Sequence, residues 1–416
     1  MKQHYDLVII GGGMVGASLA CALLPASERL GLKIAVIEAH PMPQADSLEY
    51  QPSYDARATA LAYGSRSIYE AMGVWPALSQ HLAPIEHIHV SDRGQFGTAH
   101  LRASDEQLPA LGYVIENHWL GSVLLNHLTH QTSAERVDFL CPAEVTDIRF
   151  TPEGNSVDLQ MDGSALTLQA ELVVMADGGR SPLRDKLGIH YQEHAYQQHA
   201  LIANLTLDRP HGAVAYERFT DTGPMALLPL TTLASESRVA LVWTLPSEQL
   251  DGIQALSDEQ FIAQVQERFG YRAGRIIKTG QRACYPLKLV VAEEQVRRGL
   301  VVLGNAAHAL HPIAGQGYNL ALRGVAALAE QLIQAREQAK TLGDLQVLQD
   351  FYDQQKRDQQ RTIDLSDQAM QLFSNRQPLL AAGRSLGLQL LDICPPIKTL
   401  FARGAMGLDT PAPRLK

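Results

Sequence analysis

The 416-residue sequence has little cysteine, no excess of basic charge and no long uninterrupted apolar run. Its four cysteines lie far apart without a CxxC pair, which argues against a zinc site or a disulfide scaffold and indicates free thiols in a reducing compartment. Lys and Arg number 35 against 44 Asp and Glu, a net charge of −9. Nucleic acid is therefore not an expected partner of the whole molecule.

The most apolar segment is residues 7–24, "LVIIGGGMVGASLACALL". A secretory signal needs a continuous apolar region, and glycines interrupt this one. No other segment reaches membrane-spanning length. We therefore expect a cytoplasmic protein. A composition of 46% hydrophobic and 19% charged residues is that of an ordinary globular protein. The length favours two domains or one elaborated domain.

The N-terminal segment has the pattern of a strand, a tight turn, a helix and a second strand. Leu7–Ile10 and Lys33–Glu38 are short apolar runs typical of buried parallel strands. Between them we predict a helix from about Met14 to Leu24, ended near Pro25. From about Tyr196 onward, strand-like runs separated by turn signals predict an antiparallel sheet instead. The expected fold is α/β, with a discontinuous nucleotide-binding domain into which an antiparallel domain is inserted.

The first strand ends in a G-x-G-x-x-G motif formed by Gly11, Gly13 and Gly16. Gly11 permits the tight turn, a side chain at Gly13 would block a pyrophosphate, and Gly16 lets helix and strand pack closely. Glu38 ends the second strand, where a carboxylate accepts hydrogen bonds from ribose hydroxyls. The motif predicts a bound dinucleotide, and by itself it leaves both FAD and NAD open.

Two further glycine-rich turns follow buried apolar strands. Residues 177–184, "DGGRSPLR", follow the strand 172–176, and residues 304–320, "GNAAHALHPIAGQGYNL", follow the strand 300–303. A helix is predicted from about Asn319 to Glu337, and its entrance can face an electron-rich group. His308 and His311 are spaced like a metal pair, but no third ligand accompanies them, so we expect no metal site.

The three motifs in this order resemble the FAD-dependent aromatic hydroxylases, the para-hydroxybenzoate hydroxylase-like class. Asp177, Gly178, Ser181 and Arg184 match that family's DGxxSxxR motif. Its GDAAHxxxPxxGxGxN motif matches at eight positions, namely Gly304, Ala306, Ala307, His308, Pro312, Gly315, Gly317 and Asn319. Asn305 departs from the usual aspartate, but an asparagine carbonyl still accepts a hydrogen bond from a ribityl hydroxyl. His118 stands where an arginine is frequent.

The resemblance is closer to the branch of ubiquinone-biosynthesis hydroxylases, through "YDARATALAYGS", "YERFTDTGPMALLPL" and "RACYPLKL". It implies hydroxylation of a polyprenylated phenol through a C4a-hydroperoxyflavin, with NADH or NADPH and O₂ as co-substrates. The spellings "HVSDRG" and "GNAA" favour 2-polyprenyl-6-methoxyphenol as the substrate, hydroxylated para to its hydroxyl. A sister ring hydroxylase, another flavoprotein on the same fold and a non-catalytic FAD-binding subunit are the alternatives.

The resemblance also implies which residues bind FAD, while it identifies no catalytic side chain. These residues are Gly11, Gly13, Gly16, Glu38, Arg57, Asp177, Arg184, Asn305, Pro312, Gly315, Gly317 and Asn319. Tyr216, Phe219 and Trp243 are candidates either for the substrate cavity or for the core.

The expected division is a Rossmann-like FAD-binding domain at 1–72, 100–184 and 284–363, and a substrate domain at 73–99 and 185–283. A C-terminal helical segment takes up 364–416. Residues 371–416 hold six Lys or Arg, two Asp and many leucines. This segment is expected either to cap the core or to contact a membrane surface or a protein complex of the same pathway.

Overall fold

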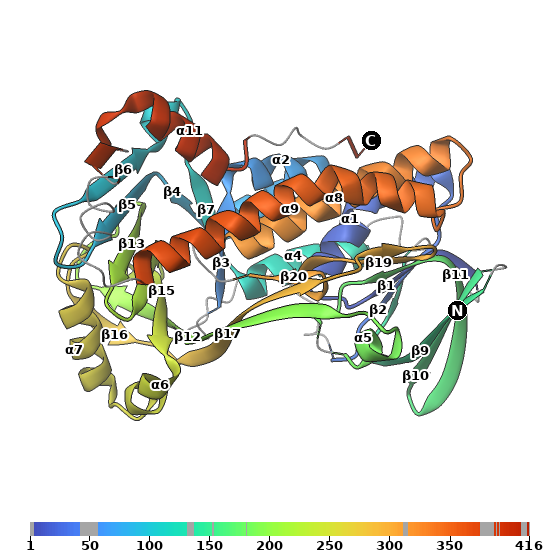
Figure 1. Ribbon diagram of the computed structural model, residues 1–416, viewed down its shortest axis with the longest axis horizontal. Coiled ribbons are helices and arrows are strands. Elements are labelled where there is room, and N and C mark those ends of the chain that lie inside the picture. Colours follow the sequence, from blue (N-terminus) through green and yellow to red (C-terminus); the bar gives the residue numbers. More distant parts are fainter. Residues whose placement is uncertain are drawn as a thin grey trace.

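The computed structural model describes residues 4–41, 57–130, 137–151, 154–179, 181–310, 315–374, 387, 389–390, 392–408 and 414–415. In Figure 1 a largely parallel sheet lies at one end of the molecule and an antiparallel sheet at the other. Two long helices, α8 (Gln316–Glu337) and α9 (Leu345–Ser374), run along the molecule, and α9 contacts strands at both ends, β18 at one and β13 and β14 at the other.

The parallel sheet contains the predicted strand pair and confirms its direction. Its strand order is β18-β19-β11-β1-β2-β8, and β1 is parallel to both β2 and β11. A hairpin of β9 and β10 continues it from β11. The bounds are β1 His4–Ile10, β2 Ile34–Ile37, β8 Val137–Leu140, β9 Ala143–Thr151, β10 Gly154–Met161, β11 Ser164–Met175, β18 Val296–Arg297 and β19 Leu300–Val302.

Alternation along β1 divides the core between the two faces of this sheet. Leu7 and Ile9 belong to a cluster formed with the helices α1 (Met14–Leu30), α4 (Asn117–His130) and α8. Val8 and Ile10 pack instead with residues of the β9–β10 hairpin. Successive side chains of a strand point to opposite faces, so a strand covered on both faces is apolar throughout. This arrangement explains the continuous apolar run.

Helix α1 runs to Leu30, and the predicted end near Pro25 is therefore wrong. Pro25 lies inside the helix with its ring exposed, while Ala26 and Ser27, which follow it, are buried. A proline removes one backbone hydrogen bond. The burial of Ala26 and Ser27 offsets that loss, and the helix ends at Gly31, which has a left-handed φ of 69°.

The antiparallel sheet confirms the expectation for the segment after Tyr196. Its order is β20-β17-β12-β15-β14-β13-β5-β6, with β16 beside β12 and β5 parallel to β13. The bounds are β5 His87–Asp92, β6 Thr98–Arg102, β12 Tyr191–Leu207, β13 Val214–Thr220, β14 Gly223–Pro229, β15 Ser237–Pro246, β16 Ile276–Thr279, β17 Ala283–Ala292 and β20 His308–Ala309.

A small three-stranded sheet, β3-β7-β4, lies between the two large ones (Figure 1). Its strands are β3 Ala58–Ala62, β4 Leu82–Ile85 and β7 Gly112–Glu116. The other helices are α2 Tyr63–Ala71, α3 Trp75–Leu78, α5 Leu183–Lys186, α6 Ser247–Gln254, α7 Asp258–Phe269 and α11 Pro395–Ala405. The division into domains stays a prediction. Strand pairing does place both β6 and β17 in the antiparallel sheet, and α9 continues across residue 363.

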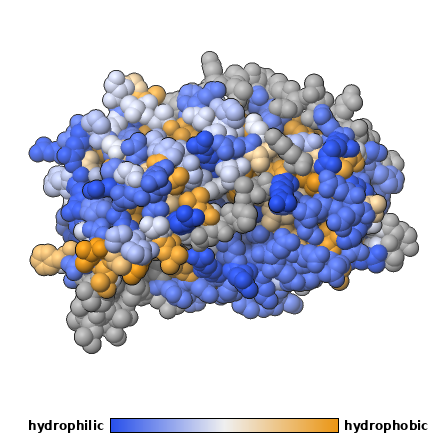
Figure 2. Space-filling view, turned by 90° about the horizontal axis from the view of Figure 1, so that it is seen from above, coloured by the Kyte–Doolittle hydropathy of each residue, from blue (hydrophilic) through white to orange (hydrophobic). Residues whose placement is uncertain are grey.

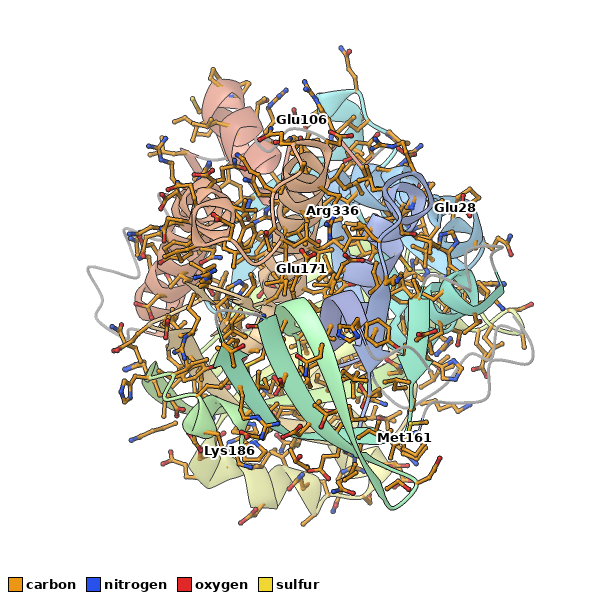
Figure 3. The ribbon with its side chains drawn as sticks, turned by 90° about the vertical axis from the view of Figure 1, so that its right-hand side faces the viewer. Glu28, Glu106, Met161, Glu171, Lys186 and Arg336 are labelled. Atoms are coloured by element: carbon orange, nitrogen blue, oxygen red, sulfur yellow. The ribbon has the colours of Figure 1, made fainter. Side chains whose placement is uncertain are left out.

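Ion pairs join segments that are far apart in the sequence. Arg336 of α8 contacts Asp6 at 2.6 Å and Glu171 of β11 at 3.3 Å, and Figure 3 shows Arg336 and Glu171 near each other. Arg238 of β15 contacts Glu116 of β7 at 2.9 Å. The side chains of this second pair are only 0% and 6% exposed, so the pair joins the antiparallel and small sheets inside the protein.

Within the described ranges, no helix is long and apolar enough to cross a membrane.

We predict that Glu116→Gln destabilises the fold by about 3 kcal/mol, because it removes the negative charge that the buried Arg238 guanidinium contacts at 2.9 Å. The matched control is Glu70→Gln in the exposed Arg66–Glu70 pair, whose N–O distance is 2.7 Å. The control should cost less than about 0.5 kcal/mol. Urea unfolding measures both variants, and equal losses would contradict the prediction.

Candidate functional site

Four parallel strands end at one edge of the sheet, and each is followed by a polar or glycine-rich turn. Gly11 follows β1, Glu38 follows β2, Asp177 follows β11 and Asn305 follows β19. All four residues line the same cavity. Ligands of open α/β sheets bind outside the carboxyl ends of the strands, so this edge is the expected place for a nucleotide.

The first glycine turn is held by contacts that exclude side chains. Gly11 has a φ of +102°, and a Cβ there would lie 2.5 Å from the carbonyl oxygen of Ala176. A Cβ at Gly16 would lie 1.9 Å from the carbonyl oxygen of Gly11. At Gly13 a Cβ would meet nothing within 4 Å. Gly11 and Gly16 are therefore required by the fold, whereas Gly13 keeps space free beside the N-terminus of α1.

Glu38 lies beside this turn. One of its carboxylate oxygens accepts a hydrogen bond from the Gly12 amide at 2.8 Å, and the other accepts from the His40 amide at 2.9 Å. The side chain is 15% exposed and lines the cavity. A carboxylate oxygen has more than one lone pair, so the fixed group can still accept a hydrogen bond from a ribose hydroxyl.

In the second motif, residues 177–184, the beginning lines the cavity and Arg184 at its end does not. The Asp177 carboxylate accepts hydrogen bonds from the Gly179 amide at 2.9 Å and from the Ser181 hydroxyl, and both Asp177 and Ser181 line the cavity. Arg184 is not among the lining residues. Its guanidinium lies 5.0 Å from the ring centroid of Tyr191 and 3.5 Å from Glu193. The structure therefore groups Arg184 with β12, and its assignment to FAD stays a prediction.

The entrance of α8 completes this part of the cavity. Gly315 has a left-handed φ of +61° at the N-cap, and a Cβ there would lie 3.0 Å from the Cβ of Ala60. Gly317 is open on the side where a Cβ would project. Arg57 precedes β3 and lines the cavity with both glycines. Pro312 lies outside the described residues.

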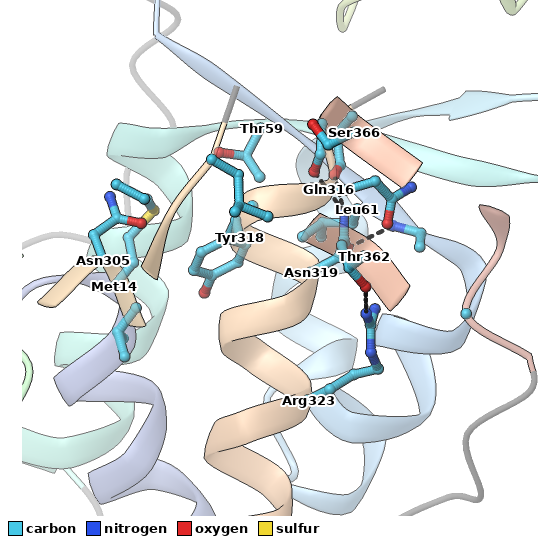
Figure 4. A pocket seen from close by; sticks show the side chains of 18 of the residues that line it. Met14, Thr59, Leu61, Asn305, Gln316, Tyr318, Asn319, Arg323, Thr362 and Ser366 are labelled. Atoms are coloured by element: carbon cyan, nitrogen blue, oxygen red, sulfur yellow. Dashed lines mark hydrogen bonds between the residues drawn. The ribbon is translucent and has the colours of Figure 1, made fainter. Parts of the chain in front are cut away.

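Asn319 holds the α8 entrance against β3 and α2. Its side-chain oxygen accepts from the Ala62 amide and the Ser65 hydroxyl, both at 2.8 Å, and its amide donates to the carbonyls of Ala60 and Gly315, also at 2.8 Å. An asparagine side chain has two donor hydrogens and two acceptor lone pairs, all of which are used here. Figure 4 shows Asn319 beside Gln316 and Leu61. Asn319 thus positions the backbone of the entrance.

His308 does not belong to the cavity lining. It is buried, and this burial lowers the pKa of its imidazole to about 4, so the ring is neutral at physiological pH. His311, the second histidine of this motif, for which we expected no metal, lies outside the described residues. Among the residues that are described, no group of three or more His, Cys, Asp or Glu side chains could hold a metal ion.

The cavity extends from the glycine turns to the antiparallel sheet, with a volume of about 1840 Å³. Tyr216 and Phe219 line it, whereas Trp243 is fully buried in the core of that sheet. Sequence reasoning missed Glu217, which also lines the cavity, although a carboxyl in an alternating apolar strand was a visible signal. It also did not place α11 at the cavity, which Leu390, Ile397, Leu400 and Phe401 of the C-terminal segment line.

These features fit FAD. The cradle at Gly13 is open, the N-terminus of α1 carries no side-chain cap, and a carboxylate follows the second strand. Small-molecule pockets of roughly 300–1,000 Å³ are usual, so this cavity has room for a dinucleotide and a second ligand. The fold and the site together define a flavoprotein with a separate substrate surface.

The comparisons agree with this class. The FAD binding domain family matches residues 4–358, and the chain belongs to that family. The ubiquinone hydroxylase UbiL of Rhodospirillum rubrum is 36% identical over 99% of this chain and 92% of the relative. The 3-demethoxyubiquinol 3-hydroxylase of Escherichia coli is 30% identical over 98% of this chain and 100% of the relative.

A solved structure shows the same fold. The p-nitrophenol 4-monooxygenase PnpA of Pseudomonas putida superposes with a TM-score of 0.76 at 16% identity, covering 98% of this chain and 99% of the other. The protein is an FAD-dependent aromatic hydroxylase, a monooxygenase of the class that takes its electrons from NADH or NADPH. The expected fold class and cofactor are thereby confirmed.

We predict that Gly13→Val removes bound FAD but leaves the fold intact, because the new side chain enters only the open cradle. Gly11→Val is the contrasting variant, since its Cβ collides with the Ala176 carbonyl and its φ is positive. The flavin content of purified Gly13→Val should fall at least about tenfold. Its far-ultraviolet circular dichroism should match that of the wild type, while Gly11→Val should fold poorly. Full flavin content in Gly13→Val would contradict this account of the cradle.

Proposed function

We propose that the chain hydroxylates the ring of a polyprenylated phenol in ubiquinone biosynthesis, with 2-polyprenyl-6-methoxyphenol as substrate and the position para to its hydroxyl as the target. The single observation that carries this proposal is the continuous cavity, which joins the nucleotide edge to an apolar sheet face and an apolar helical rim. A phenol with an isoprenoid tail has the matching chemistry. The names of the two bacterial relatives support the pathway, and "HVSDRG" and "GNAA" support the particular substrate.

Each residue of the nucleotide edge then has a proposed role. Gly13 and the N-terminus of α1 bind the pyrophosphate, Glu38 the ribose and Asn305 the ribityl chain. Bound FAD supplies the redox chemistry that activates O₂. The amides at the α8 entrance stabilise negative charge on the reduced ring. Further contacts are proposed from Arg57, Asp177, Arg184, Pro312, Gly315 and Gly317, with Asn319 holding the entrance in place.

The protein's share of the reaction is orientation and exclusion of water. The antiparallel sheet presents aliphatic side chains to the cavity, and these exclude water from the reacting ring. The lining aliphatic residues of that sheet are Ile88, Val90, Leu101, Ile202, Ala215, Ala226, Leu228 and Val242. The isoprenoid tail extends toward the apolar residues of the C-terminal segment.

The purified protein with FAD, NADH or NADPH, O₂ and a short-chain 2-prenyl-6-methoxyphenol should oxidise the nicotinamide faster when the phenol is present. It should release the ring-hydroxylated product. Cells that lack the protein should accumulate 2-polyprenyl-6-methoxyphenol. Accumulation of a different intermediate would assign the chain to a sister hydroxylase, and nicotinamide oxidation that no phenol stimulates would rule out both.

The C-terminal segment from Ile393 through α11 suits contact with an anionic membrane surface, and we propose that it docks there to receive the lipid-tailed substrate. Ile393, Ile397 and Leu400 are 73%, 52% and 67% exposed. Figure 2 shows apolar side chains at the surface at the end of the molecule that carries α11. Arg403 is exposed on α11 and provides positive charge there, whereas Lys398 of the same helix is paired with Asp105 at 3.1 Å. An apolar face with basic neighbours binds the interface of anionic bilayers.

Ile393→Glu should weaken sedimentation with anionic phospholipid vesicles by about tenfold. The variant places a negative charge against the anionic lipid and removes apolar area that the bilayer would bury. Ile277→Glu is the matched control, because Ile277 is 59% exposed on β16 of the antiparallel sheet. Its binding should equal that of the wild type. Equal vesicle binding by Ile393→Glu and wild type would exclude docking through the segment that contains Ile393 and α11.

A further inference from the structure

One ionisable side chain of the antiparallel sheet lies toward the cavity. It belongs to a rung, meaning a row of directly paired residues on neighbouring strands, whose other members are aliphatic. Glu217 of β13 pairs with Val90 of β5 and with Ala226 of β14, and the rung continues through Val242 to Ile202. Cross-strand partners lie on the same face of a sheet, and all five residues line the cavity. Ala215 and Phe219, two residues away on either side, line it as well.

Glu217 has no compensating partner within the part of the chain that the structure describes. None of those residues forms a hydrogen bond or an ion pair with its carboxylate. The side chain is partly exposed to the cavity, yet the surrounding protein removes it from bulk water. This burial alone raises the pKa of the carboxyl from 4.5 to about 7.

The neighbouring elements bring few other charges to this side. Asp92 is the ionisable residue of β5 in register with Phe219, β14 contributes none, and Asp358 and Arg361 of α9 line the cavity. Asp358 is paired with Arg323 at 2.7 Å. None of these groups contributes to the shift in the pKa of Glu217.

A lone carboxyl on an apolar face lowers the stability of the fold, and such positions are typical of functional sites. Leucine or valine would continue the rung without that cost. The glutamate is therefore best explained by a ligand that the cavity receives.

Contacts between elements place Glu217 near the α8 entrance. Ala215 and Ala58 of β3 belong to one packed cluster, and Glu217 lies two residues further along β13, about 7 Å away along the strand. Ala60 of β3 in turn packs against Gly315 of the α8 entrance. Glu217, Ala60 and Gly315 also line the same cavity, so the carboxyl shares this space with the turn that the proposed function assigns to the flavin ring.

We propose that Glu217 recognises the hydroxyl of the phenol substrate and accepts its proton during ring hydroxylation. This inference rests on the proposed function. In the step, the phenolic O–H bond breaks, the proton moves to a carboxylate oxygen, and the electron pair stays on the phenol oxygen. The added electron density activates the ortho and para ring carbons toward an electrophilic oxygen. The proton is released to water when the product leaves, which restores the carboxylate.

Glu217→Gln tests the proton transfer because the amide keeps the size and hydrogen-bonding capacity but cannot accept the proton. We expect unchanged flavin content and a loss of about 10²-fold in product formation. The wild-type rate should rise with pH through about 7, as the carboxyl ionises, and the variant should lack this rise. Glu248→Gln, an exposed carboxyl on α6, is the control and should behave as the wild type. Equal rates and pH profiles in Glu217→Gln and wild type would overturn the proposal.

Stability provides a second readout that needs no activity. The folded-state pKa lies above the ordinary value, so the folded protein holds the proton more tightly than the unfolded chain. Stability therefore falls as pH rises from about 4.5 to about 7. The melting temperature of Glu217→Gln should match the wild type at pH 4.5 and exceed it at pH 8. No such difference at pH 8 would show that the carboxyl is not desolvated and would overturn the proposal.

Binding separates failure of this inference from failure of the proposed function. The wild type should bind a short-chain 2-prenyl-6-methoxyphenol about tenfold more tightly than its O-methyl ether, and Glu217→Leu should lose this preference. Retention of the preference in Glu217→Leu would overturn the role of Glu217 even if the wild type hydroxylates the phenol. Conversely, a wild type that shows the preference but forms no product would refute the proposed function and leave the recognition by Glu217 standing.

Discussion

The close approach of β1, β11 and α1 at Gly11 and Gly16 is the contact on which the rest of the structure depends. A Cβ at Gly11 would lie 2.5 Å from the carbonyl oxygen of Ala176, the residue that follows β11. This contact sets the angle at which α1 leaves the sheet and aligns its amides with the strand ends. The carboxylate of Glu38 and the turns at Asp177 and Asn305 are arranged around the space that results.

A second constraint joins this nucleotide edge to the surface that receives the substrate. Strand β3 of the small sheet accepts a hydrogen bond from Asn319 at the α8 entrance. Strand β7 of the same sheet holds the buried Glu116, whose partner Arg238 lies in the antiparallel sheet. The same cavity therefore has a polar end, where backbone amides and carboxylates meet, and an apolar end, where aliphatic rungs and the C-terminal segment meet. A redox cofactor and the lipid-tailed phenol of the proposed function need these two environments side by side.

Sequence patterns within short segments predicted the strands and turns whose structure depends on those segments alone. The strand pair, the first glycine turn and the antiparallel segment were all readable, because apolar runs and glycine spacing reflect backbone geometry directly. The predicted helix end at Pro25 was wrong, because the burial of Ala26 and Ser27 offset one missing hydrogen bond. Trp243 and Phe219 are both apolar residues of predicted strands, so the sequence alone did not say which of them faces the cavity. The structure shows that Phe219 lines the cavity and that Trp243 lies in the core.

The sequence by itself determined the class of the protein, since three glycine-rich motifs in order specify both a dinucleotide cradle and the family that uses it. The tertiary structure decided what shares the cavity with that cradle. It left Arg184 outside the cavity lining and paired every donor and acceptor of the Asn319 side chain within the protein. It also brought Glu217 and α11 to the same cavity. The physical reason is that a motif records backbone geometry along the chain. The surroundings of a side chain depend on strands and helices that are hundreds of residues away.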